Sequence, residues 1–138
     1  MYLYFAYGSN LDRRQMRRRC PNARLEGPAY LDGWRLTFDG FSVSWGGAVA
    51  SLERASDSYV PGLLWSLCSD DLQRLDQFEG HPICYRRRSL VIDAGVYCQA
   101  QVYIKDRRSQ AALPSRKYFG VIWQAYRLND FDKHSLIP

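Results

Sequence analysis

One short segment near the start of the chain combines the residue types of an anion-binding loop. Tyr7-Gly8-Ser9-Asn10-Leu11 follows an apolar, aromatic run from Tyr2 to Ala6 and precedes a strongly basic stretch. Gly8 tolerates backbone angles that other residues avoid, Ser9 and Asn10 are good helix N-caps, and a helix N-terminus presents free N–H donors. The segment predicts a strand, a tight loop and a helix start that together could hold a carboxylate or a phosphate. Taken alone, the pattern is also typical of capped turns that bind nothing.

A second segment, Phe78-Glu79-Gly80-His81-Pro82-Ile83-Cys84-Tyr85-Arg86, holds the candidate acid–base residue. Glu79 falls at the predicted C-terminal end of a helix, where the helix dipole opposes a carboxylate. That dipole and partial burial would raise the carboxyl pKa from about 4.3 toward neutral, which suits a general acid/base, whereas the run Arg86 to Arg88 would lower it. A solvated helix-end carboxylate or an arginine partner also fits Glu79 taken alone.

Together, these two segments resemble the γ-glutamylcyclotransferase-like family, whose members open with a strand running into YGSNL and carry a catalytic glutamate in an E-G-x-P type segment. His81 and Pro82 directly after Gly80 are similar to the compact plant and bacterial branch of that family. The resemblance spans nearly the whole chain and implies a small α/β-barrel fold. It also implies an enzyme that closes the γ-glutamyl group of a γ-glutamyl amide into 5-oxoproline and releases the amine, with no cofactor and no metal.

The resemblance implies a role for each site residue. Glu79 would take a proton from the substrate α-ammonium and return one to the departing amine. The backbone N–H groups of Gly8, Ser9, Asn10 and Leu11 would hold the α-carboxylate or the developing oxyanion. Three tyrosines would line the pocket, although each alone is also typical of a core position: Tyr7, Tyr85 and Tyr118.

Other candidate groups carry weaker signals. Ser9 lacks a G-x-S-x-G context and an assignable base, which favours a capping role over a nucleophilic one. His81 is either a second proton carrier or an ordinary loop histidine. The four cysteines are scattered, without a C-x-x-C pair or clustered histidines, and indicate buried, reduced thiols rather than a zinc site or disulfides: Cys20, Cys68, Cys84 and Cys98.

The 138 residues carry a formal net charge of +5, mainly from arginine clusters that could attract nucleic acid or acidic metabolites. Because no nucleic-acid-binding module is recognisable, solvated faces are the favoured interpretation. No stretch approaches the roughly 20 apolar residues of a membrane span, and Met1 leads straight into a predicted strand, so we expect a soluble cytoplasmic protein. The clusters are Arg13-Arg14, Arg17 to Arg19, Arg86 to Arg88 and Arg107-Arg108.

Local patterns predict six strands and three short helices. The strands are expected at 2–6, 29–38, 41–52, 59–67, 85–93 and 97–105, with hairpin turns at Asp39-Gly40 and Ala94-Gly95. Helices are expected from Leu11 to about Arg19, from Ser69 to Glu79, and after Pro114-Ser115, with a tail from about Asn129. These elements predict one α+β domain over residues 1–138, with a small mixed, curled or barrel-like sheet and helices packed around it.

The last helix is expected to bury a face of Tyr118, Val121, Ile122 and Ala125, and the helix before it a face of Leu72, Leu75 and Phe78. For function, the alternatives to an enzyme are a non-catalytic module that binds an anion in the Tyr7–Leu11 loop and an interaction protein whose arginine faces dock an acidic partner. Glu79 argues against a pure anion binder, because a carboxylate repels anions.

Overall fold

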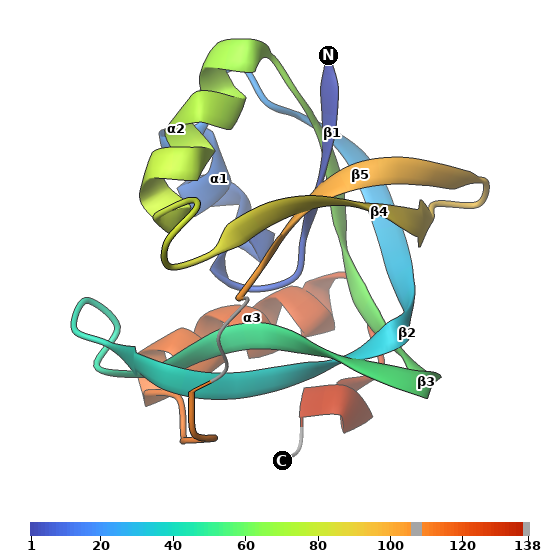
Figure 1. Ribbon diagram of the computed structural model, residues 1–138. Coiled ribbons are helices and arrows are strands. Elements are labelled where there is room, and N and C mark those ends of the chain that lie inside the picture. The colour runs from blue at the N-terminus through green and yellow to red at the C-terminus, as the bar shows by residue number, and fades with distance from the viewer. Residues whose placement is uncertain (106–108, 137–138) are drawn as a thin grey trace.

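Five strands close into a barrel in the computed structural model, which describes residues 1–105 and 109–136 (Figure 1). The order around the barrel is β1-β3-β2-β4-β5, and all neighbours are antiparallel except β1 and β5. The strands are β1 Tyr2–Ala6, β2 Arg24–Ser42, β3 Gly47–Leu67, β4 Arg86–Asp93 and β5 Tyr97–Ile104. The predicted α+β class with a barrel-like sheet is confirmed.

Three α-helices and two short 3-10 helices surround this sheet. They are η1 Ser9–Leu11, α1 Arg13–Arg19, α2 Ser69–Glu79, α3 Arg116–Leu128 and η2 Lys133–Leu136. In Figure 1, α1 and α2 lie beside β1 at one end of the barrel, while α3 runs along the far part of the β2–β3 hairpin. Among the described residues, no helix is long and apolar enough to cross a membrane.

The predicted hairpin turn at Asp39-Gly40 is wrong. β2 continues through both residues, and the chain turns at residues 43–46 before β3. Gly40 has a φ of 67° next to a register shift between Asp39 and Ser42, so its left-handed backbone forms an irregularity inside the strand instead of a turn. Residues 47–52 and 59–67, expected in two separate strands, belong to the single strand β3, which leaves five strands instead of six.

The first helix begins later than predicted. Ser9–Leu11 form a 3-10 turn, and the side chain of Asp12 caps α1 by accepting from Arg14 N–H at 3.0 Å. Asp12 therefore takes the capping role expected of Ser9 or Asn10. The N–H groups available near this loop belong to the 3-10 turn and not to the N-terminus of α1.

The two later helices follow their sequence signals closely. Gly80 ends α2 in a left-handed conformation (φ 66°), and the Ser115 side chain caps α3 by accepting from Tyr118 N–H. The buried face of α3 consists of Tyr118, Ile122, Ala125 and Tyr126, while Val121 is only partly buried. Phe78 departs from the expected apolar face of α2, since its side chain is 57% exposed.

The segment from Asn129, expected as a tail, packs on the core through its described part. Phe131 and Leu136 are buried, and the Phe131 ring meets Tyr126 edge-to-face at 5.5 Å between ring centroids. Ile137 and Pro138 lie outside the described residues.

Candidate active site

A cavity of about 610 Å³ opens where the loop after β1, the last turn of α2 and the tip of the β2–β3 hairpin meet. Of the residues predicted from sequence, Tyr7, Gly8, Ser9, Asn10, Glu79, Tyr85 and Tyr118 line it. Leu11 does not, because its side chain is buried in the hydrophobic core. One cavity thus brings together the two segments, which lie about 70 residues apart in the chain.

Glu79 is the last residue of α2, and its carboxyl group lies in this cavity. Gly80 then turns the chain away in a left-handed conformation that a residue with a Cβ would adopt only with strain. Burial raises the pKa of the Glu79 carboxyl from its usual 4.5 to about 7, and the positive charge of Arg19 partly opposes that rise. The lowering influence expected from the arginines after Tyr85 comes instead from Arg19.

Asn10 connects the loop to Glu79. Its side-chain oxygen accepts from Gln15 Nε2 at 3.0 Å and from Arg19 Nη1 at 3.3 Å. Its Nδ2 donates to the Tyr4 hydroxyl at 2.9 Å and lies 3.5 Å from Glu79 Oε1. Because the Asn10 side chain is 2% exposed, this network fixes the amide and hence one contact of the Glu79 carboxyl.

The loop backbone leaves three N–H groups free for a ligand. Leu11 N–H donates to the Gly8 carbonyl at 3.0 Å, and Asp12 N–H donates to the Ser9 carbonyl at the same distance. The N–H groups of Gly8, Ser9 and Asn10 have no acceptor among residues 1–105 and 109–136. A Cβ on Gly8 would come within 3.3 Å of the Tyr118 hydroxyl, so glycine keeps this wall of the cavity open.

The tyrosine hydroxyls in the cavity divide into two kinds. Tyr7 donates to the Tyr103 carbonyl, and Tyr85 donates to the Ala50 carbonyl at 2.6 Å. Tyr118, in contrast, accepts from Ala50 N–H at 2.9 Å. Burial raises the pKa of all three phenols well above their usual range, which keeps them protonated.

A hydrogen-bonded clamp holds the last turn of α2 against the barrel. The Asp76 carboxylate, one turn before Glu79, accepts from Arg87 Nε at 2.9 Å, from Arg87 Nη2 at 3.2 Å and from the Tyr103 hydroxyl at 2.6 Å. His81, the other proton carrier considered from sequence, accepts at Nδ1 from Arg87 N–H at 3.1 Å. It is not among the described residues that line the cavity.

Sequence reasoning missed several residues that line the cavity, and three of them carry a hydroxyl or a positive charge that bears on the site. Tyr4 lies in an aromatic strand typical of any core, and Arg19 lies in a basic run interpreted as solvated. Lys105 also lines the cavity, and its Nζ bonds Asp39 Oδ1 at 2.6 Å. Only the tertiary contacts distinguish these residues from their neighbours in sequence.

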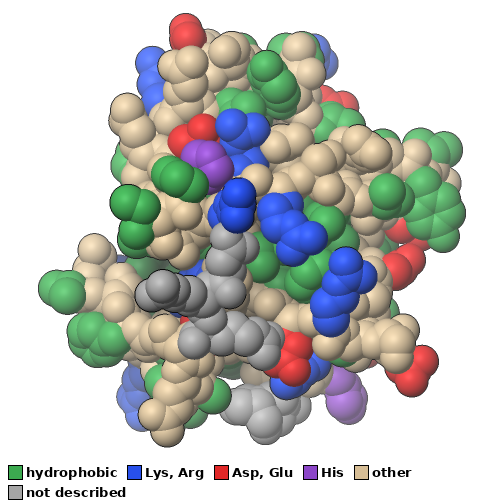
Figure 2. All heavy atoms as spheres, viewed as in Figure 1, with side chains coloured by type: hydrophobic (Ala, Val, Ile, Leu, Met, Phe, Trp, Pro, Cys, Tyr) green, Lys and Arg blue, Asp and Glu red, His purple; other side chains and the backbone are tan. Residues whose placement is uncertain are grey.

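The remaining arginines largely serve other purposes. Four of the five on α1 are exposed, whereas Arg87 belongs to the clamp and Arg88 lies 5.9 Å from the centre of the Trp34 ring. Figure 2 shows Lys and Arg side chains distributed over the face that β4 and β5 present. Arg107 and Arg108 lie outside the described residues. The cysteines are free thiols, but only Cys20 is buried, and the exposed Cys84 lines the cavity.

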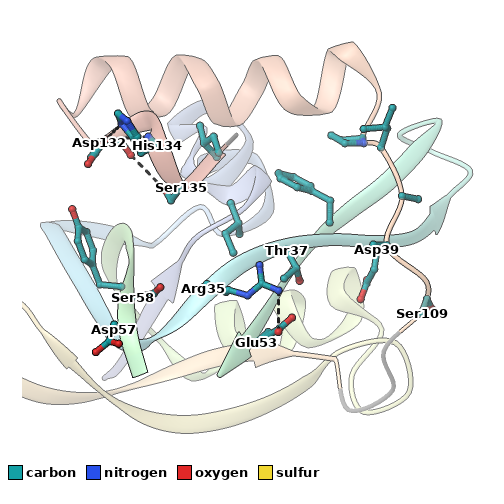
Figure 3. Close-up of a pocket in the computed structure, with 18 residues that line it drawn as sticks. Arg35, Thr37, Asp39, Glu53, Asp57, Ser58, Ser109, Asp132, His134 and Ser135 are labelled. Atoms are coloured by element: carbon teal, nitrogen blue, oxygen red, sulfur yellow. Dashed lines mark hydrogen bonds and ion pairs between the residues drawn. The ribbon is translucent and has the colours of Figure 1, made fainter. Parts of the chain in front are cut away.

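A larger hollow of about 890 Å³ lies between η2, the chain before α3 and the β2–β3 hairpin (Figure 3). Figure 3 shows Arg35 pointing to Glu53, with 2.9 Å between their charged groups, and Asp132 beside His134. None of the site residues predicted from sequence lines this hollow. We therefore place the candidate active site in the smaller cavity around Glu79.

Comparison with known proteins agrees with the fold. A family model described as "Gamma-glutamyl cyclotransferase, AIG2-like" matches residues 4–123. The chain belongs to this family. The matched residues include β1 from Tyr4 onward, the loop, α2 with Glu79, and α3 as far as Trp123.

Individual proteins similar to this chain are named gamma-glutamylcyclotransferases. The gamma-glutamylcyclotransferases of mouse and cattle are 28% and 34% identical to it over 113 residues, which cover 79% of this chain and 54% of each relative. The chain thus spans about half the length of these curated relatives. A solved gamma-glutamyl cyclotransferase structure matches with a TM-score of 0.86 at 26% identity, covering 93% of this chain and 79% of that one.

Proposed function

We propose that this chain is a γ-glutamylcyclotransferase-type enzyme that converts a γ-glutamyl amide or amine into 5-oxoproline and the free amine. One observation carries the proposal: the carboxyl group of Glu79, with a pKa raised to about 7, lies in the same cavity as the free N–H groups of Gly8, Ser9 and Asn10. A titrating carboxyl and an anion-binding loop are what this reaction requires. The family membership and the relatives' names support the same chemistry.

Glu79 handles the protons in this proposal. A carboxyl group with a pKa near 7 is about half ionised at neutral pH, so it accepts a proton from the substrate α-ammonium and later donates one to the departing nitrogen. The freed α-amino nitrogen attacks the γ-carbonyl carbon and closes a five-membered lactam. One carboxyl group serves both steps because both nitrogens bond to the same carbon.

The loop and the tyrosines orient the substrate. The N–H groups of Gly8, Ser9 and Asn10 hold the α-carboxylate, as backbone donors in a tight turn hold anions elsewhere. Tyr7 and Tyr85 form rigid walls because their hydroxyls are tied to backbone carbonyls, and Tyr118 presents its hydroxyl beside Gly8.

Ring closure within one molecule needs little covalent help from the protein. A well-oriented intramolecular attack gains up to about 7–11 kcal/mol from orientation. The cavity therefore contributes chiefly by holding the γ-glutamyl group folded upon itself. Phe41 and Ile83, both exposed, border the cavity, which supports an exit for the released amine past these two side chains.

A substrate panel tests the proposal. The protein is incubated with γ-glutamyl amino acids, γ-glutamyl amines and ε-(γ-glutamyl)lysine, and 5-oxoproline is detected by mass spectrometry. We expect product from the wild type and from the control Glu26→Gln, whose carboxylate accepts from Ser66 outside the cavity. Glu79→Gln should form little product. Salt-dependent binding to DNA, RNA or an acidic protein, with no product from any panel member, would favour a non-catalytic function.

A further inference from the structure

The hydroxyl group of Tyr4 accepts a hydrogen bond beside the candidate active site, but its own proton has no acceptor among the described residues. Its side chain is 4% exposed and lines the cavity together with Glu79. Its ring is held edge-to-face against Tyr103, with 5.8 Å between the ring centroids. Its only polar partner among the described residues is Asn10.

The direction of the Tyr4–Asn10 hydrogen bond follows from Arg19. A guanidinium group only donates, so the Asn10 atom 3.3 Å from Arg19 Nη1 is the side-chain oxygen. The amide nitrogen therefore faces Tyr4 and donates to its hydroxyl oxygen at 2.9 Å. The O–H proton of Tyr4 is left to point elsewhere, and no described residue accepts it.

A buried hydroxyl without an acceptor is uncommon in folded proteins. Tyr4 lines the cavity, where water or substrate would complete its hydrogen bonding. Tyr7 and Tyr85 differ in this respect, because their protons are already bonded to backbone carbonyls. Tyr4 also lies close to Glu79, since Asn10 Nδ2 is within 3.5 Å of both the Tyr4 hydroxyl and Glu79 Oε1.

We propose that the Tyr4 hydroxyl donates a hydrogen bond to the substrate γ-carbonyl oxygen as that oxygen becomes negatively charged during ring closure. The proposal rests on the cyclotransferase reaction proposed above. Attack by the α-amino nitrogen forms the C–N bond and moves the carbonyl π electrons onto oxygen. Collapse restores the C=O bond and breaks the bond to the leaving nitrogen, which takes from Glu79 the proton that came from the α-ammonium. The ring nitrogen gives up its second proton to the released amine, which leaves as an ammonium ion. Both nitrogens and the oxyanion share one carbon, so a donor beside Glu79 is placed for that oxygen.

The test is Tyr4→Phe, with Tyr126→Phe as the control, since Tyr126 is buried on α3 outside the cavity. We expect kcat for 5-oxoproline formation to fall on the order of 10²-fold in Tyr4→Phe, with KM little changed. The rise of kcat/KM with pH should keep its midpoint near 7, because Glu79 is untouched. Thermal unfolding and 5-oxoproline binding establish that the variant is folded and its cavity formed.

Any other outcome contradicts the proposed role of the Tyr4 hydroxyl. A raised KM with unchanged kcat means that Tyr4 binds the α-carboxylate instead. A displaced pH midpoint means that it acts through Glu79. Product from the wild type with an unaltered rate in Tyr4→Phe removes this role alone, whereas no product from the wild type removes the proposed function and this role with it.

Discussion

Replacing Glu79 with Gln is expected to stabilise the folded protein progressively as pH rises, relative to the wild type. Folding moves the Glu79 carboxyl into the cavity and raises its pKa from 4.5 to about 7. Between these pKa values the unfolded chain ionises Glu79 and the folded chain does not, so the wild type loses stability as pH rises toward 7. At about 1.4 kcal/mol for each tenfold change in proton affinity, the loss is about 3 kcal/mol. Because the Gln side chain does not ionise, the variant does not lose this stability as pH rises.

Urea unfolding followed by tryptophan fluorescence measures this difference, because Trp65 is buried in the barrel. The free energy of unfolding is determined for both proteins at several pH values between about 4 and 8. Near pH 4 both carry an uncharged side chain at position 79, so any difference there reports packing alone and serves as the internal control. The variant should then gain about 3 kcal/mol over the wild type by pH 8. A difference that stays constant across this range would refute a carboxyl at position 79 whose pKa is raised on folding.

Two further predictions concern the residues around Glu79 and the barrel. Arg19→Met should move the acidic midpoint of the pH profile of kcat/KM above about 7, because Arg19 lowers the pKa of Glu79. Arg19→Lys keeps the positive charge and should move the midpoint less. An unmoved midpoint in Arg19→Met would contradict the influence of Arg19 on Glu79. Gly62→Ala should destabilise the protein by about 1–3 kcal/mol, because a Cβ there would lie 2.6 Å from Phe5 Cζ. The matched control is Gly120→Ala, where a Cβ meets open space on an exposed part of α3, and it should stabilise the protein by about 1 kcal/mol. Urea unfolding of both glycine variants checks this pair, and equal effects would rule out the close β1–β3 packing.

Elements with strong local signals could be predicted from sequence. β1 and α2 lie where apolar periodicity and terminal residues placed them, and the β4–β5 hairpin forms across Ala94-Gly95. The Asp39-Gly40 turn failed because a distant segment decides its geometry: Gly40 N–H donates to the Gln110 carbonyl, and Ala112 N–H donates to the Phe38 carbonyl. A dipeptide signal contains no information about such pairing.

Some residues of the candidate site could likewise be predicted from sequence, and others could not. Glu79 and the Gly8–Asn10 loop stand out in sequence through their spacing and their motif resemblance, and the structure brings them to one cavity. Tyr4 and Arg19 do not stand out, since an aromatic residue in a strand and an arginine among arginines have many neighbours of their own kind. Their importance arises from the Asn10 network, which forms only when β1, α1 and α2 pack together.

Turnover of a γ-glutamyl substrate by the wild type and by Glu79→Gln tests the role of Glu79 most directly. With a substrate that the panel identifies, kcat for 5-oxoproline formation should fall on the order of 10²–10⁴-fold in the variant, while a folded structure and substrate binding persist. Unchanged kcat in a folded Glu79→Gln protein would contradict acid–base catalysis by this residue.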